Sequence, residues 1–307
     1  MTTTLAGEAA CLTAALLWAV SLAVFRASIA THGARTINLA KCALASVLQG
    51  ATVLALGQAE ALWGAPGRDL VLLAASGMIG LTLGDTALFA AVTRIGLHRT
   101  LLLQTLSPVF AAILAAVWQG EQPTIAQAVG AATVLVGVGV VVAPSRTKRP
   151  ESAGPGKASG ARSWAAAGVF LAILAAFGQG SGLVLAKVGM AGIPVIAASF
   201  FRLAAAAIGL AMLAVAVGRL HRLGPVARSR RDLIRVVPAT FFGTYLALFA
   251  MMAGVALAPA SVAAVLLSTS PLFSLLIERV VDKRPVTARG LVGTLLAIAG
   301  VAVLVNG

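Results

Sequence analysis

The chain has 307 residues, of which 60% are hydrophobic and only 10% are charged, and its mean hydropathy is +0.99. This composition excludes a soluble globular fold, because apolar runs of about 20 residues, the length that crosses a bilayer, recur along the chain. The net charge of +14 does not indicate nucleic-acid binding, because the basic residues lie in loops between apolar runs and are not interleaved with aromatic residues. We therefore expect a protein of the lipid bilayer without a nucleic-acid partner.

The first half of the chain contains five apolar runs, each long enough to span a membrane as a helix. Strands of a β-barrel would be about half as long and would alternate polar and apolar residues, so a barrel is excluded. The start of the chain lacks the positive flank of a signal peptide, so the first run is expected to be a membrane span. The five runs are approximately Gly7 to Arg26, Thr36 to Leu56, Leu70 to Val92, Arg99 to Trp118 and Thr124 to Ala143.

The second half repeats this pattern after a stretch rich in Pro, Gly, Ser and basic residues. That stretch, residues 144–163, has no helical pattern and is expected to be a flexible linker. It separates a first five-helix unit, residues 1–143, from a second, residues 164–307. The runs of the second unit are approximately Trp164 to Lys187, Pro194 to Val217, Leu233 to Val255, Ser261 to Val281 and Val286 to Val305.

A tandem duplication relates the two units. A shift of about 163 positions places Arg68-Asp69-Leu70 on Arg231-Asp232-Leu233 and Ser107-Pro108 on Ser270-Pro271, and a slightly shorter shift of about 161 serves the first two runs. Five spans per unit is an odd number, so the second unit enters the membrane in the opposite sense. We therefore expect an all-α polytopic membrane protein with ten transmembrane helices in two inverted five-helix repeats.

Positive charge is concentrated in the loops after the first, third, fifth, seventh and ninth runs, whereas the other loops hold little beyond Arg68 and Lys187. By the positive-inside rule, the basic loops are cytoplasmic and both termini lie outside. The basic loop residues are Arg35, Arg94, Arg99, Arg146, Lys148, Arg149, Lys157, Arg162, Arg219, Arg222, Arg228, Arg230, Arg231, Lys283 and Arg284.

Pro108 and Pro271 fall near the middle of equivalent runs and predict helix breaks, because a mid-helix proline leaves the carbonyl four residues earlier without its donor. In transporters built from inverted repeats, such breaks lie at the midplane substrate site. Polar residues at the same depth are expected to line that site or, as the alternative, to bond back to their own helices at packing kinks. They are Gln104, Thr105, Ser107, Ser268, Thr269 and Ser270.

Asp85 is the acidic residue set deepest in an apolar run, and its counterpart in the second unit is Leu248. A lone buried carboxylate takes up protons readily, so Asp85 is a candidate for proton coupling. The alternatives are a structural salt bridge, to Arg94 or Lys41, and hydration near the cytoplasmic mouth.

Lys41 and Arg202 lie about a third of the way into equivalent runs, and inversion places them toward opposite membrane faces. Each is a candidate gate contact for a carboxylate or phosphate, and the alternative is that each snorkels to headgroups or pairs with loop carbonyls. An aromatic residue in a span also serves as a packing residue or interface anchor. Further candidates to line a cavity with apolar walls are Trp18, Ser21, Gln179, Ser181 and Tyr245.

Glycines at a spacing of seven in the fifth and tenth runs predict close packing between the units, because this spacing keeps them on nearly one helical face. They are Gly130, Gly137, Gly293 and Gly300. The Gly178-Gln179-Gly180-Ser181-Gly182 run is interpreted as helix-packing or hinge sequence, because no strand precedes it and no Lys-Ser/Thr follows it.

Other polar residues do not form a recognisable reactive site. Glu278 and Asp282 beside Arg279 are expected to be a solvated ion-pair cluster. The histidines His32, His98 and His221 are expected in loops without metal spacing, and Cys11 and Cys42 suggest no chemistry. No catalytic residue, metal or cofactor is therefore expected.

These residues resemble the drug/metabolite transporter superfamily, EamA type, over almost the whole chain. The motifs that carry the resemblance are Leu17-Trp18-Ala19-Val20-Ser21 through Arg26, Asn38-Leu39-Ala40-Lys41, Thr105-Leu106-Ser107-Pro108-Val109-Phe110, Gly120-Glu121 with Thr124, Ser199-Phe200-Phe201-Arg202 and Ser270-Pro271-Leu272-Phe273. Where the family pattern would place a second Gly-Glu, this chain has Lys283-Arg284.

The resemblance implies secondary transport of a small metabolite or drug through a central cavity, commonly as export. We expect an inner-membrane monomer or homodimer that alternates access around a midplane cavity, driven by proton exchange or by the substrate gradient alone. The alternatives are an intramembrane enzyme for lipid-linked substrates, which needs clustered catalytic residues at one membrane face, and a membrane scaffold that moves no solute.

Overall fold

The structure is a computed structural model that describes residues 2–119, 124–143, 155–257 and 260–306. Within these residues the chain is helical without strands, and ten segments are long and apolar enough to cross a membrane, as the sequence predicts. Several spans are built from two or three consecutive helices. The first half comprises α1 (Thr2–His32), α2 (Ala34–Ala55), α3 (Glu60–Trp63), α4 (Gly67–Ser76), η1 (Gly77–Gly84), α5 (Asp85–Ile95), α6 (Leu97–Gln104), α7 (Ser107–Gln119) and α8 (Ile125–Val142).

The second half begins with a helix that is longer than expected. α9 (Pro155–Gly189) starts inside the stretch predicted to be a flexible linker, so the part of that stretch from Pro155 onward is helical, whereas residues 144–154 lie outside the described residues. The remaining elements are α10 (Val195–Ala216), η2 (Leu220–Arg222), α11 (Leu223–Arg228), α12 (Arg230–Thr240), η3 (Phe241–Leu246), α13 (Ala247–Leu257), α14 (Ala260–Leu267), α15 (Ser270–Val280) and α16 (Ala288–Asn306).

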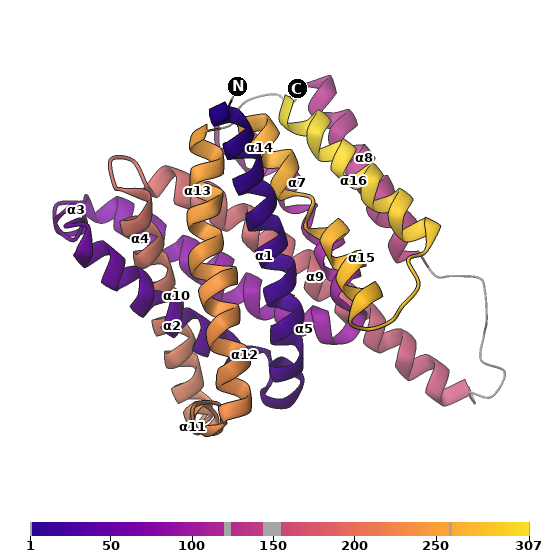
Figure 1. The fold of residues 1–307 in the computed structure, drawn as a ribbon, viewed down its shortest axis with the longest axis horizontal. Coiled ribbons are helices and arrows are strands. Elements are labelled where there is room, and N and C mark those ends of the chain that lie inside the picture. Colours follow the sequence, from indigo (N-terminus) through magenta and orange to yellow (C-terminus); the bar gives the residue numbers. More distant parts are fainter. Residues whose placement is uncertain (1, 120–123, 144–154, 258–259, 307) are drawn as a thin grey trace.

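The pairing of α8 with α16 shows that the halves are inverted. Gly130 of α8 faces Gly300, whereas Gly137, two turns further along α8, faces Gly293, which lies two turns earlier in α16. The two helices are equivalent members of the repeats and run antiparallel, which requires a two-fold axis perpendicular to them, in the membrane plane. An added Cβ at Gly137 would lie 2.6 Å from the Ala297 nitrogen, so the predicted close glycine packing is confirmed. Figure 1 shows this pair along one edge of the molecule.

The same two-fold relation between the halves is seen in the helix contacts at the centre of the bundle. α1 packs on η3 where Ser21 meets Gly243, and α9 packs on η1 where Gly182 meets Gly80, which are equivalent pairs in the repeat alignment. α2 and α10, which are also equivalent, pack against each other. The start of α1 and the end of α16 lie at the same end of the bundle (Figure 1), as an even number of spans requires.

Backbone irregularities recur at equivalent positions. α6 ends at Gln104 and α7 begins at Ser107, while α14 ends at Leu267 and α15 begins at Ser270, so both Ser-Pro motifs lie at helix breaks, as predicted. The third and eighth spans each contain a π-helical segment, η1 and η3, that the sequence analysis did not predict. Such segments are often found at functional sites.

Candidate functional site

The π-helical segment η1 places a carboxylate inside the bundle. Asp85 directly follows η1, its N–H donates to the carbonyl of Gly80 five residues earlier, and it is only 6% exposed. A π turn is wider than an α turn and rotates the residues that follow it, so the direction of the Asp85 side chain depends on this segment.

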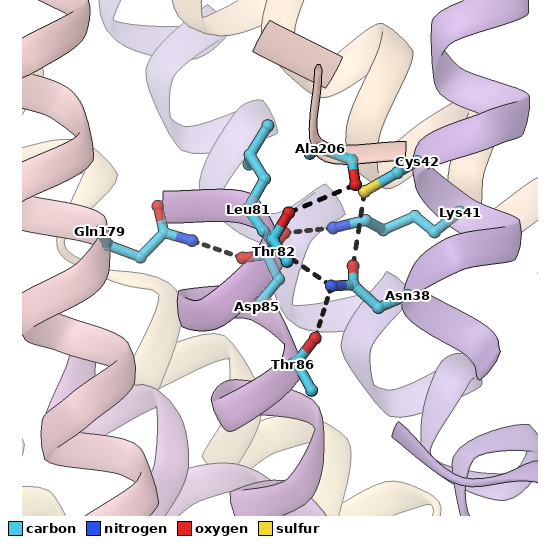
Figure 2. A network of polar contacts seen from close by, with 9 residues as sticks. All are labelled: Asn38, Lys41, Cys42, Leu81, Thr82, Asp85, Thr86, Gln179 and Ala206. Carbon is cyan, nitrogen blue, oxygen red and sulfur yellow. Dashed lines mark hydrogen bonds and ion pairs between the residues drawn. The ribbon is translucent and has the colours of Figure 1, made fainter. Parts of the chain in front are cut away.

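Two side chains from different halves hold Asp85 (Figure 2). The Lys41 ammonium on α2 forms an ion pair with Oδ2, and the Gln179 amide on α9 donates to Oδ1 at 2.5 Å. Lys41 is only 5% exposed, and its ammonium also lies 5.3 Å from the centre of the Phe89 ring. Of the two cations considered as partners, Asp85 therefore pairs with Lys41 and not with Arg94, which instead donates to the Ala90 carbonyl and stacks over Trp164.

Neutral side chains fix the backbone around Asp85. Asn38 Nδ2 donates to the Leu81 carbonyl at 2.8 Å and to Thr86 Oγ1 at 2.9 Å, and Thr82 Oγ1 donates to the Ala206 carbonyl at 3.2 Å. These bonds connect η1 and α5 to both α2 and α10 (Figure 2). The sequence analysis missed Thr82 and Thr86, and it used Asn38 only as part of a family motif.

The glycine run of α9 allows this helix to contact two irregular segments at once. An added Cβ at Gly178 or Gly182 would approach the backbone of η1 within 3.0 Å, and one at Gly180 would clash with the Ser107 carbonyl at the α6–α7 break. Ser76 Oγ adds a hydrogen bond between the two spans by donating to the Gly182 carbonyl at 2.5 Å. The run therefore has the helix-packing role that the sequence predicted, and it brings Gln179 within reach of Asp85.

Arg202 of α10 also packs against η1. Its backbone contacts Gly77, and an added Cβ at Gly80 would lie 3.8 Å from its Nη2 atom. Among the described residues it has no hydrogen-bond partner or ion pair, and its Nε atom is buried. Because Gly77 precedes Asp85 by two turns, Arg202 and Lys41 occupy different depths, as inversion predicts.

The polar residues at the two helix breaks behave differently. The hydroxyls of Thr105, Ser268 and Ser270 donate to carbonyls of the helix that precedes each break, within their own spans, which is the alternative that the sequence left open. By contrast, Gln104 Nε2 and Ser181 Oγ are buried without a partner among the described residues. These two groups are therefore available to a ligand.

Three predicted cavity residues lie apart from Asp85. Tyr245 of η3 bonds through its hydroxyl to Thr52 at 2.8 Å and stacks with Phe241 and Phe249. Ser21 is buried against Gly243, and Trp18 is half-buried one turn away on α1. Trp18 is the repeat counterpart of Gln179, so it belongs to the equivalent contact of α1 with η3 and not to the contact of α9 with η1 that holds Asp85.

A second set of polar contacts joins the halves at the end of the bundle where α1 ends. Arg26 donates twice to Asp282, at 2.6 and 2.7 Å, which holds the pKa of this carboxyl below its usual range. His32 and Ser28 both lie 2.9 Å from the carboxylate of Asp232. Asp282 therefore belongs to a partly exposed ion pair, and its partner is Arg26, which the sequence analysis did not name, in place of the neighbouring Arg279.

The histidine predictions also need correction. His98 is buried in α6, where its ring Nδ1 lies 3.2 Å from the Pro271 carbonyl and its backbone N–H donates to the Glu278 carboxylate at 3.1 Å. His32 belongs to helix α1 and not to a loop. Within the described ranges, no group of three or more His, Cys, Asp or Glu residues could hold a metal ion.

In this conformation the charged pair is closed off. A pocket of about 410 Å³ lies between α8 and α16, away from Asp85, and is lined by Ala126, Ala302, Val303 and Asn306. The solvent-reachable midplane cavity expected from the sequence stays a prediction for another state of the molecule.

Comparisons with known proteins agree with this architecture. The model of the EamA-like transporter family matches residues 5–143 and 166–306, one match for each repeat. A crystal structure of a protein with 20% sequence identity superimposes with a TM-score of 0.64 over 98% of this chain and 96% of that chain, which shows a shared fold. A search of curated protein sequences gave no match. The family motif Gly120-Glu121 lies outside the described residues. With nearly all of its length matched in two repeats, the chain belongs to the EamA-like transporter family of membrane transporters.

Proposed function

We propose that this chain is a secondary transporter, working as an exporter, that binds a small metabolite or drug beside Asp85 and alternates access by rocking its two halves. The observation that carries the proposal is the position of Asp85, which is buried between α2 of the first half and α9 and α10 of the second. Movement of one half against the other changes the partners of this carboxylate, so occupancy of the site and the conformation are coupled.

The helix breaks supply the flexible points that rocking needs. Each break interrupts its span near the middle, and Gly180 packs directly on the first one. Gln104, at this break, has a free buried amide donor that suits a substrate oxygen. Gln104→Ala is expected to weaken substrate affinity, measured by uptake kinetics in proteoliposomes. Ser268→Ala is the matched control, because the Ser268 hydroxyl is bonded to its own helix.

Proton coupling is assigned to Asp85. Protonation removes the charge that holds Lys41, so the pair opens when the carboxylate takes a proton from one side and closes when it releases the proton on the other. In proteoliposomes, Asp85→Asn is expected to abolish pH-gradient-driven uptake while substrate exchange continues, and Glu60→Gln, a change at an exposed residue, is expected to do neither. Unchanged proton dependence in Asp85→Asn would exclude Asp85 as the proton-coupling residue.

The site of action is the cytoplasmic membrane, with both termini outside. Support comes from the basic loops, which alternate along the chain as the positive-inside rule requires. Single cysteines at Lys283 and Glu60, both exposed, test the orientation in a chain from which the buried Cys11 and Cys42 have been removed. A membrane-impermeant thiol reagent applied to intact cells should label position 60 and not position 283, and the reverse pattern would overturn the orientation.

A further inference from the structure

The two repeats carry equivalent cations within their spans, the buried Lys41 and the partly buried Arg202, but only one counterion among the described residues. Lys41 and Arg202 are equivalent, and so are Asp85 and Leu248. In the first half, Lys41 pairs with Asp85. In the second half the position that would supply the carboxylate is a leucine, and Arg202 has no ion-pair partner within the part of the chain that the structure describes.

Asp85 does not compensate for this missing carboxylate. It attracts the Arg202 guanidinium electrostatically, but both of its oxygens are already bonded, one to Lys41 and the other to Gln179. Among the described residues, the centre of the bundle therefore holds two cations, of which Arg202 is partly buried, and one anion. An unpaired charge inside a bilayer is costly, and guanidinium remains protonated there. The excess of one positive charge favours a ligand that brings one negative charge.

The surroundings of Arg202 suit a small ligand. Gly80 lies between the Arg202 guanidinium and Gly182 of α9. Because Gly80 has no side chain, it leaves the space between these two groups unfilled. The buried hydroxyl of Ser181, next to Gly182 in α9, has no partner among the described residues. A planar guanidinium binds a carboxylate through two parallel hydrogen bonds, which fixes its orientation as well as its charge.

We propose that Arg202 is the anchor of an anion subsite and that the substrate is a small monocarboxylate, whose single negative charge balances the buried centre. This inference rests on the proposed transport function and specifies its substrate class. Lys41 and Asp85 remain paired with each other when the carboxylate binds, and Arg202 supplies the two donors.

The test measures ligand-dependent thermal stabilisation of the full chain in detergent. Benzoate, nicotinate and butyrate are each compared with the matching amide at equal ionic strength. We expect one or more of the acids to raise the Tm and the amides to leave it unchanged. Stabilisation by the amides equal to that by the acids, or no stabilisation by any of the acids, would overturn the proposal.

Variants assign the effect to Arg202. Arg202→Gln is expected to weaken acid binding about tenfold or more, whereas Arg202→Lys, which keeps the charge but loses the planar fork, is expected to bind with intermediate affinity. Arg219→Gln, at an exposed position in the loop after α10, is the control that retains full binding. Without ligand, Arg202→Gln should have a Tm equal to or above that of the unmodified protein, because it removes a partly buried charge that has no partner among the described residues. A lower Tm together with unchanged acid binding would make Arg202 a structural residue.

Failure of this inference and failure of the proposed function give different results. If neutral solutes cross proteoliposome membranes through the protein while no acid binds, transport stands and the monocarboxylate assignment falls. If acids bind through Arg202 but no solute of either class is transported, the subsite stands and the transport function falls.

Discussion

The π-helical segments η1 and η3 occupy the same place in the two halves, yet their surroundings differ. The residue after η1 is Asp85, which is bonded to Lys41 and Gln179. Around η3 the only polar contact described is the one between Tyr245 and Thr52, and the aromatic rings of Phe241 and Phe249 complete the surroundings.

The difference separates two requirements of this architecture. Helix breaks, π segments and glycine contacts recur in both halves, so the two halves share their backbone irregularities and close packing. The buried carboxylate does not recur, since the counterpart of Asp85 is Leu248, and a second buried ion pair would add a further desolvation cost. Sequence divergence has therefore been concentrated in the chemistry and not in the backbone.

The largest expected effect comes from making η1 resemble η3. Asp85→Leu leaves Lys41 buried without a counterion and is expected to destabilise the protein by about 3–5 kcal/mol. The double variant Lys41→Leu/Asp85→Leu is expected to recover most of that loss, since two apolar residues replace the pair. Thermal unfolding in detergent measures both, and a double variant that is less stable than the single one would contradict the ion-pair explanation.

The shared backbone is tested at the seam between α8 and α16. Gly137→Val places side-chain atoms against the Ala297 and Gly293 backbone and is expected to cost about 1–3 kcal/mol by overpacking. Gly139→Val in the same helix meets nothing within 4 Å and is the matched control. Equal Tm values for the two variants would show that the seam tolerates separation of the halves.

The polar contact of η3 is expected to contribute less. Tyr245→Phe removes the hydroxyl that bonds to Thr52 while the aromatic stacking remains, so the expected loss is about 1 kcal/mol. Uptake should continue at a rate near that of the unmodified protein. Loss of pH-gradient-driven uptake as complete as that expected for Asp85→Asn would mean that the second half also contributes essential chemistry.

The smallest effect is expected at the cluster around Asp282. Asp282→Asn weakens the contact with Arg26. The side chain of Asp282 is 18% exposed and that of Arg26 is 30% exposed, so the variant is expected to lose at most about 1 kcal/mol of stability. The pKa of Asp282 is lowered in the folded protein, so its contribution is present above the unfolded value of about 3.9 and is lost as the pH falls below it. Unfolding at pH 7 and at pH 3 should show a smaller difference between variant and parent at pH 3 than at pH 7.

Much of this architecture could be predicted from the sequence. Apolar run lengths gave the ten spans, and the offset between Ser107-Pro108 and Ser270-Pro271 located both helix breaks. The odd number of spans in each half required inversion. These features depend on the length, periodicity and spacing of sequence segments. Each can be read from one segment or from a comparison of two segments.

Only the tertiary structure decided which polar groups meet. Lys41 and Arg94 were equivalent candidates to pair with Asp85, and Arg26 gave no sign that its partner would be Asp282. The outcome depends on the rotation of each helix about its own axis, which the π turns of η1 change and which packing against α9 and α10 fixes. Long-range side-chain contacts follow from that rotation, and no periodicity within a single segment records it.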